Sequence, residues 1–323
     1  MILVTGAGGF IGSHVTEELL KKGEKVRAFV HYSSRDIPGN LKFIDKDLWK
    51  NLEIFAGDLL YLDEVIKAME DVDAVIHLAA RISVNYSYKA APETVITNVK
   101  MTANVLEAAK ITGVNNIVYV SSSEVYGTPK RIPIRLSTPR KAQSPYAASK
   151  VATDELARSY ALSFGINIKI ARPFNTFGER QSTRAVIPWI LYQLLSDDIK
   201  AIEIGNLHTK RDFVYVKDTA KFLIRMLDFE SFREVNFPSG RPYSIREVIE
   251  LAKKVTGIDK EIIVKEERKR PKTSEVEVLT GDVEETYRLM SLRPGVHFEE
   301  GLKNVANWIK NNMEHIKKEH NLL

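Results

Sequence analysis

Cysteine is absent from this 323-residue sequence, so the chain can form neither disulfides nor thiolate metal sites, and it cannot use a cysteine nucleophile. Its seven histidines lack the spacing of metal ligands and have no carboxylate cluster near them. This pattern predicts that no metal is bound. We expect His14 and His77 to pack beside a sheet instead.

Long apolar runs are also missing. No run approaches the roughly 20 residues that a membrane-spanning helix needs. Met1–Thr5 lead directly into a glycine-rich loop, which leaves no space for a signal sequence. We therefore expect a cytoplasmic protein that makes no membrane contact.

Charge of one sign is not concentrated in any part of the chain. The 47 lysines and arginines are spread among 42 acidic residues and give a formal net charge of +5. The densest charged run, Lys265–Arg270, is short and mixed in sign, so we expect no nucleic acid partner. The slight positive excess suits an anionic small molecule, although solvated helix faces explain most of it.

Short β-branched segments alternate with helical patterns through the first half of the sequence, as is typical of a doubly wound α/β fold with a parallel sheet. The expected strands are Ile2–Thr5, Val26–Val30, Glu53–Ala56, Ala74–Leu78, Ile117–Ser121 and Ile168–Ala171. The expected helices between them are Gly12–Lys22, Leu62–Met69, Pro92–Thr112 and Pro145–Phe164.

After Arg172 the pattern loosens and strand signals become short and scattered. The polar stretch Met313–Leu323 is expected to fray. Further helices are expected at Thr183–Ser196, Lys217–Leu227, Ser244–Thr256, Asp282–Met290 and Glu299–Asn311. This region predicts a smaller mixed lobe over the carboxyl ends of the sheet, with a cleft between the two lobes.

A glycine-rich loop from Gly6 to Gly12 joins the first strand to the first helix. In such a loop Gly6 permits the tight turn, Gly9 permits close approach of a pyrophosphate, and Gly12 lets the helix pack on the strand. The backbone N–H groups and the helix dipole then face the phosphates. The loop, including Phe10 and Ile11, therefore predicts a dinucleotide site and a nicotinamide cofactor.

The second strand ends without the acidic residue that binds the ribose 2′-hydroxyl of NAD. We therefore expect NADP to be favoured over NAD, with His31, Ser33 and Arg35 holding a 2′-phosphate. The alternative is that these residues only cap a solvated turn. Asp58, followed by Leu59 after the third strand, is expected to meet the adenine amino group, or else to cap a turn.

The pattern Tyr-x-x-x-Lys occurs twice. In Tyr126–Lys130 a glycine and a proline interrupt any helix. Before Tyr146, Ser144 and Pro145 look like an N-cap and a first helical residue, so Tyr146 and Lys150 lie one helical turn apart on the same face. This second pair, downstream of a carboxylate at Glu124, predicts redox chemistry coupled to proton abstraction.

With these motifs, Asn98 and the segment Ser121–Gly127 in order, the sequence resembles the extended short-chain dehydrogenase/reductase family over nearly its whole length. The resemblance implies a Rossmann domain in which Leu78, Ala79 and Ala80 contact the cofactor. The segments that look like a particular branch, the nucleotide-sugar 4,6-dehydratases of legionaminic acid synthesis, are Gln143–Lys150, Arg172–Gly178 and Arg180–Pro188. Enzymes of that branch act on UDP- or GDP-linked N-acetylglucosamine. The turn from Val30 to Ser34 is similar to that of GDP-mannose 4,6-dehydratases, which use NADP.

The resemblance also implies a mechanism. Tyr146, made more acidic by Lys150 and the nicotinamide ring, would remove the proton of the sugar C4 hydroxyl while Ser122 hydrogen-bonds the same group. Hydride moves from C4 to the cofactor, Glu124 abstracts the C5 proton, hydroxide leaves C6, and the hydride returns to C6. Asn98 would help to orient Lys150 through the backbone or a water.

One residue departs from the family pattern. Many 4,6-dehydratases have an aspartic acid before the glutamate to protonate the departing hydroxyl, and this chain has Ser123. Glu124 would then serve in both directions, or a bound water would intervene. Glu124 and the two serines before it could also be no more than turn residues.

On the substrate side, the resemblance places Arg211 and Arg270 on the nucleotide diphosphate, where guanidinium groups suit the phosphate geometry. Either arginine could instead form a surface ion pair. Asn175 would contact the same phosphates. The residues expected to face the sugar are Ser83, Tyr86 and Arg184. A homodimer formed through the helices Pro92–Thr112 and Pro145–Phe164 is also implied.

Three other functions are compatible with these residues. A UDP-glucuronate decarboxylase begins with the same oxidation at C4 and needs a cation for the substrate carboxylate, which Arg184 could supply. A nucleotide-sugar 4-epimerase has no use for a base at C5. A dinucleotide sensor would keep the fold and lose turnover. In each case we assign residues 1–172, with a return segment 212–240, to the dinucleotide-binding domain, and residues 173–211 and 241–323 to the nucleotide-sugar lobe.

Overall fold

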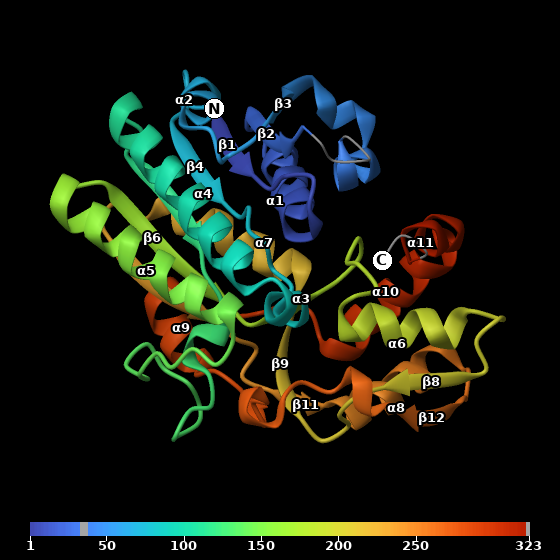
Figure 1. The fold of residues 1–323 in the computed structure, drawn as a ribbon. Coiled ribbons are helices and arrows are strands. Elements are labelled where there is room, and N and C mark those ends of the chain that lie inside the picture. The colour runs from blue at the N-terminus through green and yellow to red at the C-terminus, as the bar shows by residue number, and fades with distance from the viewer. Residues whose placement is uncertain (33–37, 321–323) are drawn as a thin grey trace.

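A parallel sheet of seven strands organises the larger part of the molecule in the computed structural model, which describes residues 1–32 and 38–320 (Figure 1). In spatial order its strands are β10 (Arg233–Phe237), β6 (Asn167–Pro173), β5 (Asn116–Val120), β4 (Ala74–His77), β1 (Ile2–Thr5), β2 (Val26–His31) and β3 (Leu52–Gly57). Every neighbouring pair is parallel. The doubly wound α/β prediction is therefore confirmed.

The strand order reverses at β1, because the chain builds β2 and β3 on one side and then returns to place β4 on the other. Connections leave the sheet in opposite directions at such a point and open a crevice at the carboxyl ends of the strands. The residues that follow β1, β4 and β5 therefore face a common space.

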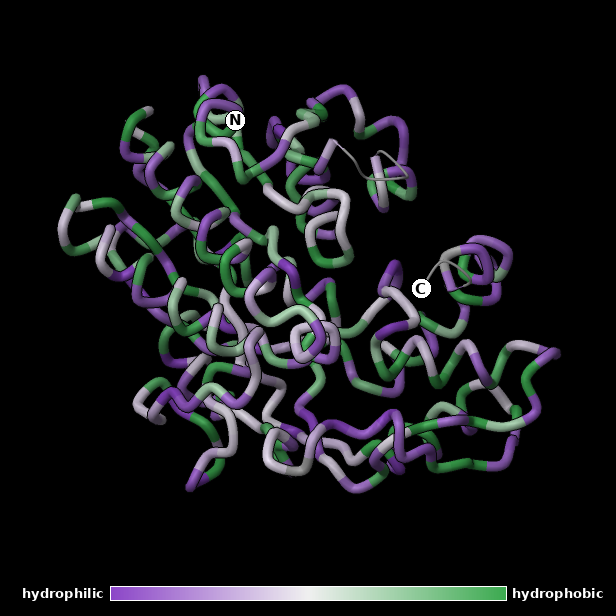
Figure 2. The backbone as a smooth tube through the Cα atoms, viewed as in Figure 1, coloured by the Kyte–Doolittle hydropathy of each residue, from purple (hydrophilic) through white to green (hydrophobic). Residues whose placement is uncertain are grey.

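Helices cover both faces of this sheet (Figure 1). One face packs against α2 (Leu62–Ala68), α4 (Ala91–Thr112) and α5 (Pro145–Phe164), and the other against α1 (Phe10–Lys21) and α7 (Val216–Arg225). Successive side chains of a strand point to opposite faces. Leu3 accordingly packs in the apolar cluster with α2, α4 and α5, and Val4 packs in the cluster with α1 and α7. Figure 2 shows the result, with hydrophobic residues along the central strands and alternating hydropathy on the helices around them.

A smaller lobe has its own sheets and its own apolar cluster. Its strands are β7 (Asn175–Phe177), β8 (Ala201–Ile204), β9 (Lys210–Tyr215), β11 (Pro242–Ser244), β12 (Glu261–Val264) and β13 (Val278–Leu279). Its helices are α6 (Val186–Leu195), α8 (Ile245–Thr256), α10 (Phe298–Asn311) and α11 (Met313–His320). Two further helices, α3 (Val84–Lys89) and α9 (Val283–Met290), lie nearer the large sheet, and Met290 of α9 is part of its core.

The segment 212–240 is divided between the two sheets. Its first residues continue β9, which pairs with β7, β11 and β13 of the smaller lobe. From Val216 onward the chain returns to the large sheet, with α7 on its face and β10 at its edge. The division into two domains remains a prediction. In the structure the chain goes back from the smaller lobe to the large sheet near residue 216.

The expectation that Met313–Leu323 frays is wrong for Met313–His320, which forms α11. Ile316 is buried in the apolar cluster of the smaller lobe. The ring of His320 stacks on Trp189 at 5.0 Å. These contacts hold a helix that its polar composition did not indicate. The last three residues lie outside the described part of the chain, and none of the described helices is long and apolar enough to cross a membrane.

His77, at the end of β4, is buried as predicted, with 2% of its surface exposed. Its Nδ1 atom lies 2.7 Å from the hydroxyl of Thr5, and its Nε2 atom lies 3.2 Å from the hydroxyl of Thr102. Burial, and then the nearby charge of Lys150, lower the pKa of His77 to about 3. The imidazole is therefore neutral in the folded protein at neutral and mildly acidic pH.

Acidification should destabilise the protein through His77. Below pH 6.5 the unfolded chain takes up a proton at this histidine, whereas the folded protein does not until about pH 3. The free energy of unfolding then falls with decreasing pH, by at most about 1.4 kcal/mol per pH unit for this site. Urea unfolding at a series of pH values should show a shallower dependence in His77→Gln. The exposed His208→Gln is the control, and equal slopes in His77→Gln and the wild type would contradict the prediction.

Candidate active site

A cavity of about 490 Å³ lies at the carboxyl ends of the central strands, where the strand order reverses. This volume is in the range of small-molecule sites. Its lining contains many of the residues predicted from the sequence, namely Gly6, Gly9, Phe10, Ile11, Gly12, His31, Leu78, Ala79, Ala80, Ser122, Tyr146 and Lys150. The remaining lining residues are Gly8, Val30, Pro38, Gly39, Ile82, Val120, Ser121, Pro173, Phe174, Thr176 and Gln181.

The glycine loop has the geometry that close approach of an anion requires. Gly6 has φ +70°, and a Cβ atom there would lie 3.0 Å from the backbone of Ala79. A Cβ atom on Gly12 would lie 2.1 Å from the carbonyl oxygen of Gly6. No side chain caps the first turn of α1, whose N-cap is Gly9. The N–H groups of that turn thus have no side-chain acceptor at the N-cap, and a pyrophosphate fits this arrangement.

Tyr146 and Lys150 occupy adjacent turns of α5, as predicted. The hydroxyl of Ser144 caps this helix by accepting a hydrogen bond from Ala147 N at 3.1 Å. Tyr146 is 7% exposed, and burial raises the pKa of its phenol, while a hydrogen bond with Ser122 lowers it. Burial lowers the pKa of Lys150 to about 8, and its Nζ atom donates to the carbonyl of Val120 at 2.8 Å.

Asn98 reaches the same helix through Ser149. Its Nδ2 atom donates to the hydroxyl of Ser149 at 2.9 Å, and that hydroxyl donates to the carbonyl of Tyr146 at 2.7 Å. Its Oδ1 atom accepts from Arg81 N at 2.7 Å. Asn98 therefore joins the loop after β4 to the turn of α5 between Tyr146 and Lys150.

The other Tyr-x-x-x-Lys pair lies apart from the cavity. Tyr126 is 1% exposed and donates to Oδ1 of Asn236 at 2.8 Å. Gly127 follows with φ +56°, so no helix continues toward Lys130. The helical context predicted for Tyr146 and Lys150 is therefore observed, and the role of Tyr146 in a reaction stays a prediction.

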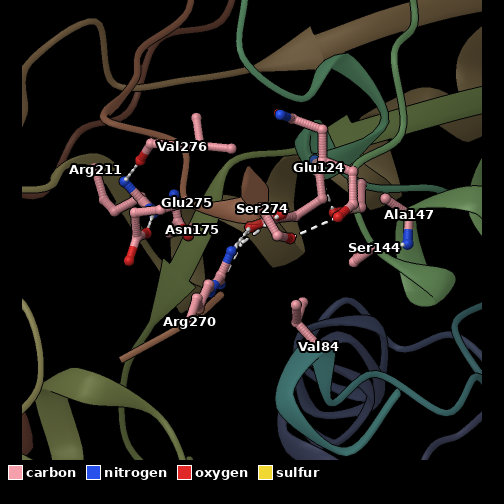
Figure 3. Close-up of polar contacts among 12 residues, drawn as sticks. Val84, Glu124, Ser144, Ala147, Asn175, Arg211, Arg270, Ser274, Glu275 and Val276 are labelled. Carbon is pink, nitrogen blue, oxygen red and sulfur yellow. Dashed lines mark hydrogen bonds and ion pairs between the residues drawn. The ribbon is translucent and has the colours of Figure 1, made fainter. Parts of the chain in front are cut away.

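Glu124 lies in the short 3-10 turn Ser123–Tyr126 directly after β5, and its N–H donates to the hydroxyl of Ser122 at 3.2 Å. Its carboxylate faces Arg270 of the smaller lobe (Figure 3). The Nη1 atom of Arg270 lies 3.4 Å from each carboxylate oxygen. The charge of Glu124 also contributes to the raised pKa of Tyr146. Ser123 is 3% exposed and does not line the cavity.

Arg211 is held by its own lobe. Its Nη1 atom donates to the carbonyl of Val276 at 2.6 Å, and its Nη2 atom donates to Glu275 at 3.2 Å (Figure 3). Burial and then the charge of Arg270 lower the pKa of Arg211. Asn175 donates to the carbonyl of Asp212 at 3.3 Å. The structure thus brings Arg211, Arg270 and Glu124 into one region.

Several predicted residues do not line the cavity. Asp58 caps its own turn, where it accepts from Leu60 N at 2.9 Å, and it lies 3.5 Å from His31. Leu59 is buried. Ser83 is the N-cap of α3 and accepts from Tyr86 N at 3.1 Å. Tyr86 and Arg184 are exposed, and Ser33 and Arg35 lie outside the described residues. Within the described ranges, no group of three or more His, Asp or Glu residues is placed to hold a metal ion.

One wall of the cavity, formed by Pro38, Gly39, Thr176 and Gln181, is not among the residues predicted from the sequence. The Pro38-Gly39 dipeptide is a turn signal after the second strand and could have been used. Thr176 and Gln181 follow β6, the next strand beyond β5 in the sheet, but no spacing within the sequence relates them to the glycine loop.

A Rossmann sheet that carries a glycine loop, a serine after β5 and a Tyr-x-x-x-Lys helix defines an extended short-chain dehydrogenase/reductase. The model of the family described as GDP-mannose 4,6 dehydratase matches residues 3–305, and the chain belongs to this family.

Relatives with different reactions are similar to the whole chain. It is 33% identical over 317 residues to a putative UDP-glucose 4-epimerase of Methanocaldococcus jannaschii, covering 97% of this chain and 99% of the relative. It is 31% identical over 323 residues to the UDP-N-acetyl-alpha-D-glucosaminuronate decarboxylase of Bacillus cytotoxicus, covering 95% and 97%. The solved structure of TunA, an NAD-dependent NDP-hexosamine 5,6-dehydratase involved in tunicamycin biosynthesis, matches with a TM-score of 0.85 at 27% identity, covering 96% and 97%.

Replacing Gly12 by alanine should disturb the glycine loop, because the added Cβ would meet backbone atoms that cannot move independently. Overpacking of this kind costs about 1–3 kcal/mol or more. We expect a lower melting temperature and weaker dinucleotide binding, measured by thermal unfolding and fluorescence titration. Gly295→Ala is the control, since its Cβ would have its nearest neighbour at 3.7 Å. Wild-type stability and affinity in Gly12→Ala would show that the close approach is not needed.

Proposed function

We propose that this protein is a nicotinamide-dependent nucleotide-sugar 4,6-dehydratase that acts on UDP- or GDP-linked N-acetylglucosamine. The observation that carries the proposal is the position of Glu124. Ser122 is the N-cap of its turn and accepts a hydrogen bond from Glu124 N at 3.2 Å, and the charge of Glu124 contributes to the raised pKa of Tyr146. A carboxylate therefore lies near the residues that would oxidise a sugar hydroxyl. A base at C5 is needed for elimination and is not needed for epimerisation at C4.

The glycine loop would hold the pyrophosphate of the cofactor, and the segment after β4 from Leu78 to Ala80 would lie along it. A bound nicotinamide dinucleotide supplies a reversible hydride acceptor for the sugar carbon. We propose that NADP is preferred, because β2 ends without an acid and His31 lies at the wall of the cavity. The NAD dependence in the name of TunA makes NAD the competing form.

The protein's own groups would move the protons of the reaction. Tyr146 takes the proton of the C4 hydroxyl while Ser122 hydrogen-bonds that oxygen, and the resulting 4-ketone acidifies the C5 hydrogen. Glu124 takes the C5 proton, the C6–oxygen bond breaks, and the leaving hydroxide receives a proton to become water. Because Ser123 is only 3% exposed and a serine hydroxyl is a weak acid, whereas the side chain of Glu124 is 14% exposed, we assign this second proton transfer to Glu124 as well.

The ion pair with Arg270 favours two alternatives. A guanidinium that neutralises Glu124 suits a 4-epimerase, in which the carboxylate has only a structural role, and the M. jannaschii relative is named as such an enzyme. A decarboxylase would need a cation for the uronate carboxylate. Arg270 lies beside the proposed reaction site, whereas Arg184 is exposed, so Arg270 would be the better candidate for that cation.

Mass spectrometry of wild type and Glu124→Gln tests these reactions. In deuterium oxide, UDP- or GDP-N-acetylglucosamine should lose one water and gain one deuterium with wild type. Glu124→Gln should still oxidise C4 and should lose at least about 100-fold in elimination, in line with the loss of a general base. The control is Glu155→Gln, an exposed glutamate of α5. Undiminished dehydration by Glu124→Gln would refute the role of Glu124, and loss of carbon dioxide from UDP-glucuronate would identify a decarboxylase.

We also propose a homodimer through α4 and α5, which lie side by side on one face of the sheet (Figure 1). Ile96 on α4 is 65% exposed and Leu162 on α5 is 76% exposed. Exposed apolar side chains on adjacent helices suit a self-complementary interface. Light scattering should give a dimer mass for wild type and a monomer mass for the double variant Ile96→Glu/Leu162→Glu. Ile263→Glu, on β12 of the smaller lobe, should remain dimeric, and a dimeric double variant would refute this interface.

A further inference from the structure

Asn40 and Arg180 join two loops from opposite halves of the chain at the wall of the cavity. Asn40 follows Pro38 and Gly39, and Arg180 precedes Gln181. Pro38, Gly39 and Gln181 line the cavity itself. The Nδ2 atom of Asn40 donates to the carbonyl of Arg180 at 3.1 Å. One hydrogen bond therefore links the two parts of the wall that no motif of the sequence predicts.

The loop that carries Asn40 also rests on the phosphate loop. Asn40 N donates to the carbonyl of Gly8 at 2.9 Å. Gly39 has φ +65°, and a Cβ atom there would lie 2.6 Å from the same carbonyl oxygen. The contact thus needs a glycine, and it holds this loop directly against the backbone that would face a pyrophosphate.

The loop that carries Arg180 is anchored on α1. The Nη2 atom of Arg180 donates to Glu17 at 2.6 Å, and the two side chains are 8% and 16% exposed. The same atom lies 3.4 Å from the carbonyl of Phe43, which ends the 3-10 turn Gly39–Phe43 that contains Asn40. Arg180 has φ +66°, a conformation that is strained for a residue with a Cβ atom and that persists only where its surroundings impose it.

We propose that Asn40, Arg180 and Glu17 form a clasp that sets how long the dinucleotide stays bound. The clasp joins the phosphate loop, α1 and the segment after β7, so the cofactor leaves only when the contacts between the two loops open. The proposal rests on the nicotinamide cofactor of the proposed function. In a reaction without net redox the cofactor is regenerated in each turnover, and slow release then carries no cost for turnover.

The release rate of the cofactor tests the clasp without reference to activity. Each protein is loaded with etheno-NADP⁺ and, separately, etheno-NAD⁺, and then chased with an excess of the unlabelled dinucleotide while fluorescence is followed. Asn40→Ala and Glu17→Gln should each release the probe at least about fivefold faster, as expected for the loss of a hydrogen bond that must open on release, or of the charge that pairs with Arg180 and also with Lys21.

Two matched controls separate the clasp from general destabilisation. Asn51 lies in the same connection between β2 and β3 as Asn40, but it does not line the cavity. Asn51→Ala removes the side chain that donates to the carbonyl of Gly23. Glu18→Gln changes the neighbouring residue of α1, which pairs with Lys21. Both should release the probe at the wild-type rate, at a temperature where every variant is folded.

The outcomes are distinct. Release within twofold of wild type in both Asn40→Ala and Glu17→Gln overturns the clasp, and equal acceleration in the controls overturns it as well. If Asn40→Ala and Glu17→Gln accelerate release but the wild type dehydrates no nucleotide sugar, the clasp is supported and the proposed function is refuted. A wild type that binds neither dinucleotide would refute both proposals.

Discussion

The buried ion pair between Asp154 and Arg172 fixes α5, the helix that carries Tyr146 and Lys150. Arg172, on β6, is 1% exposed, and its Nε and Nη2 atoms donate to one oxygen of Asp154 at 2.9 and 2.6 Å. Asp154 follows Lys150 by one turn of α5, and Lys150 follows Tyr146 by one turn. Removing one partner of a buried pair costs about 3–5 kcal/mol, because the other charge is left without compensation. The pair therefore holds the register of α5 on the sheet and, with it, the positions of Tyr146 and Lys150.

A second buried carboxylate joins the smaller lobe to the large sheet. Asp212 of β9 is fully buried and accepts hydrogen bonds from the backbone N–H groups of Ser239, Gly240 and Gly281. These residues follow β10 and precede α9. Burial raises the pKa of Asp212, and the hydrogen bonds oppose that shift. Arg211 precedes Asp212 in β9. The smaller lobe is thus attached to the end of the large sheet, and contacts within the protein position the region around Glu124 and Arg270.

Local sequence was sufficient for the parts of the site that local structure creates. The glycine loop, the N-cap before α5 and the i, i+4 spacing of Tyr146 and Lys150 each depend on neighbouring residues, and the predicted strands agree with the observed ones within one or two residues. The pairing of Glu124 with Arg270 spans 146 positions, and no pattern within the chain encodes it. The same holds for α11, where long-range contacts such as those of Ile316 and the ring of His320 distinguish an anchored helix from a polar tail.

The reaction that follows oxidation is decided by a few side chains and not by the fold. An enzyme that begins by oxidising a sugar hydroxyl uses a base and a hydrogen-bond donor at that oxygen, and in the proposed reaction Tyr146 and Ser122 would take those roles. What happens next depends on the groups that face C5 and C6. The 3-10 turn after β5 buries Ser123 and directs Glu124 toward Arg270, and this carboxylate and this guanidinium are the groups that we propose to act there. A carboxylate that can accept and return a proton is sufficient for elimination of water, whereas epimerisation would leave this partly buried carboxylate, paired with Arg270, without a chemical task.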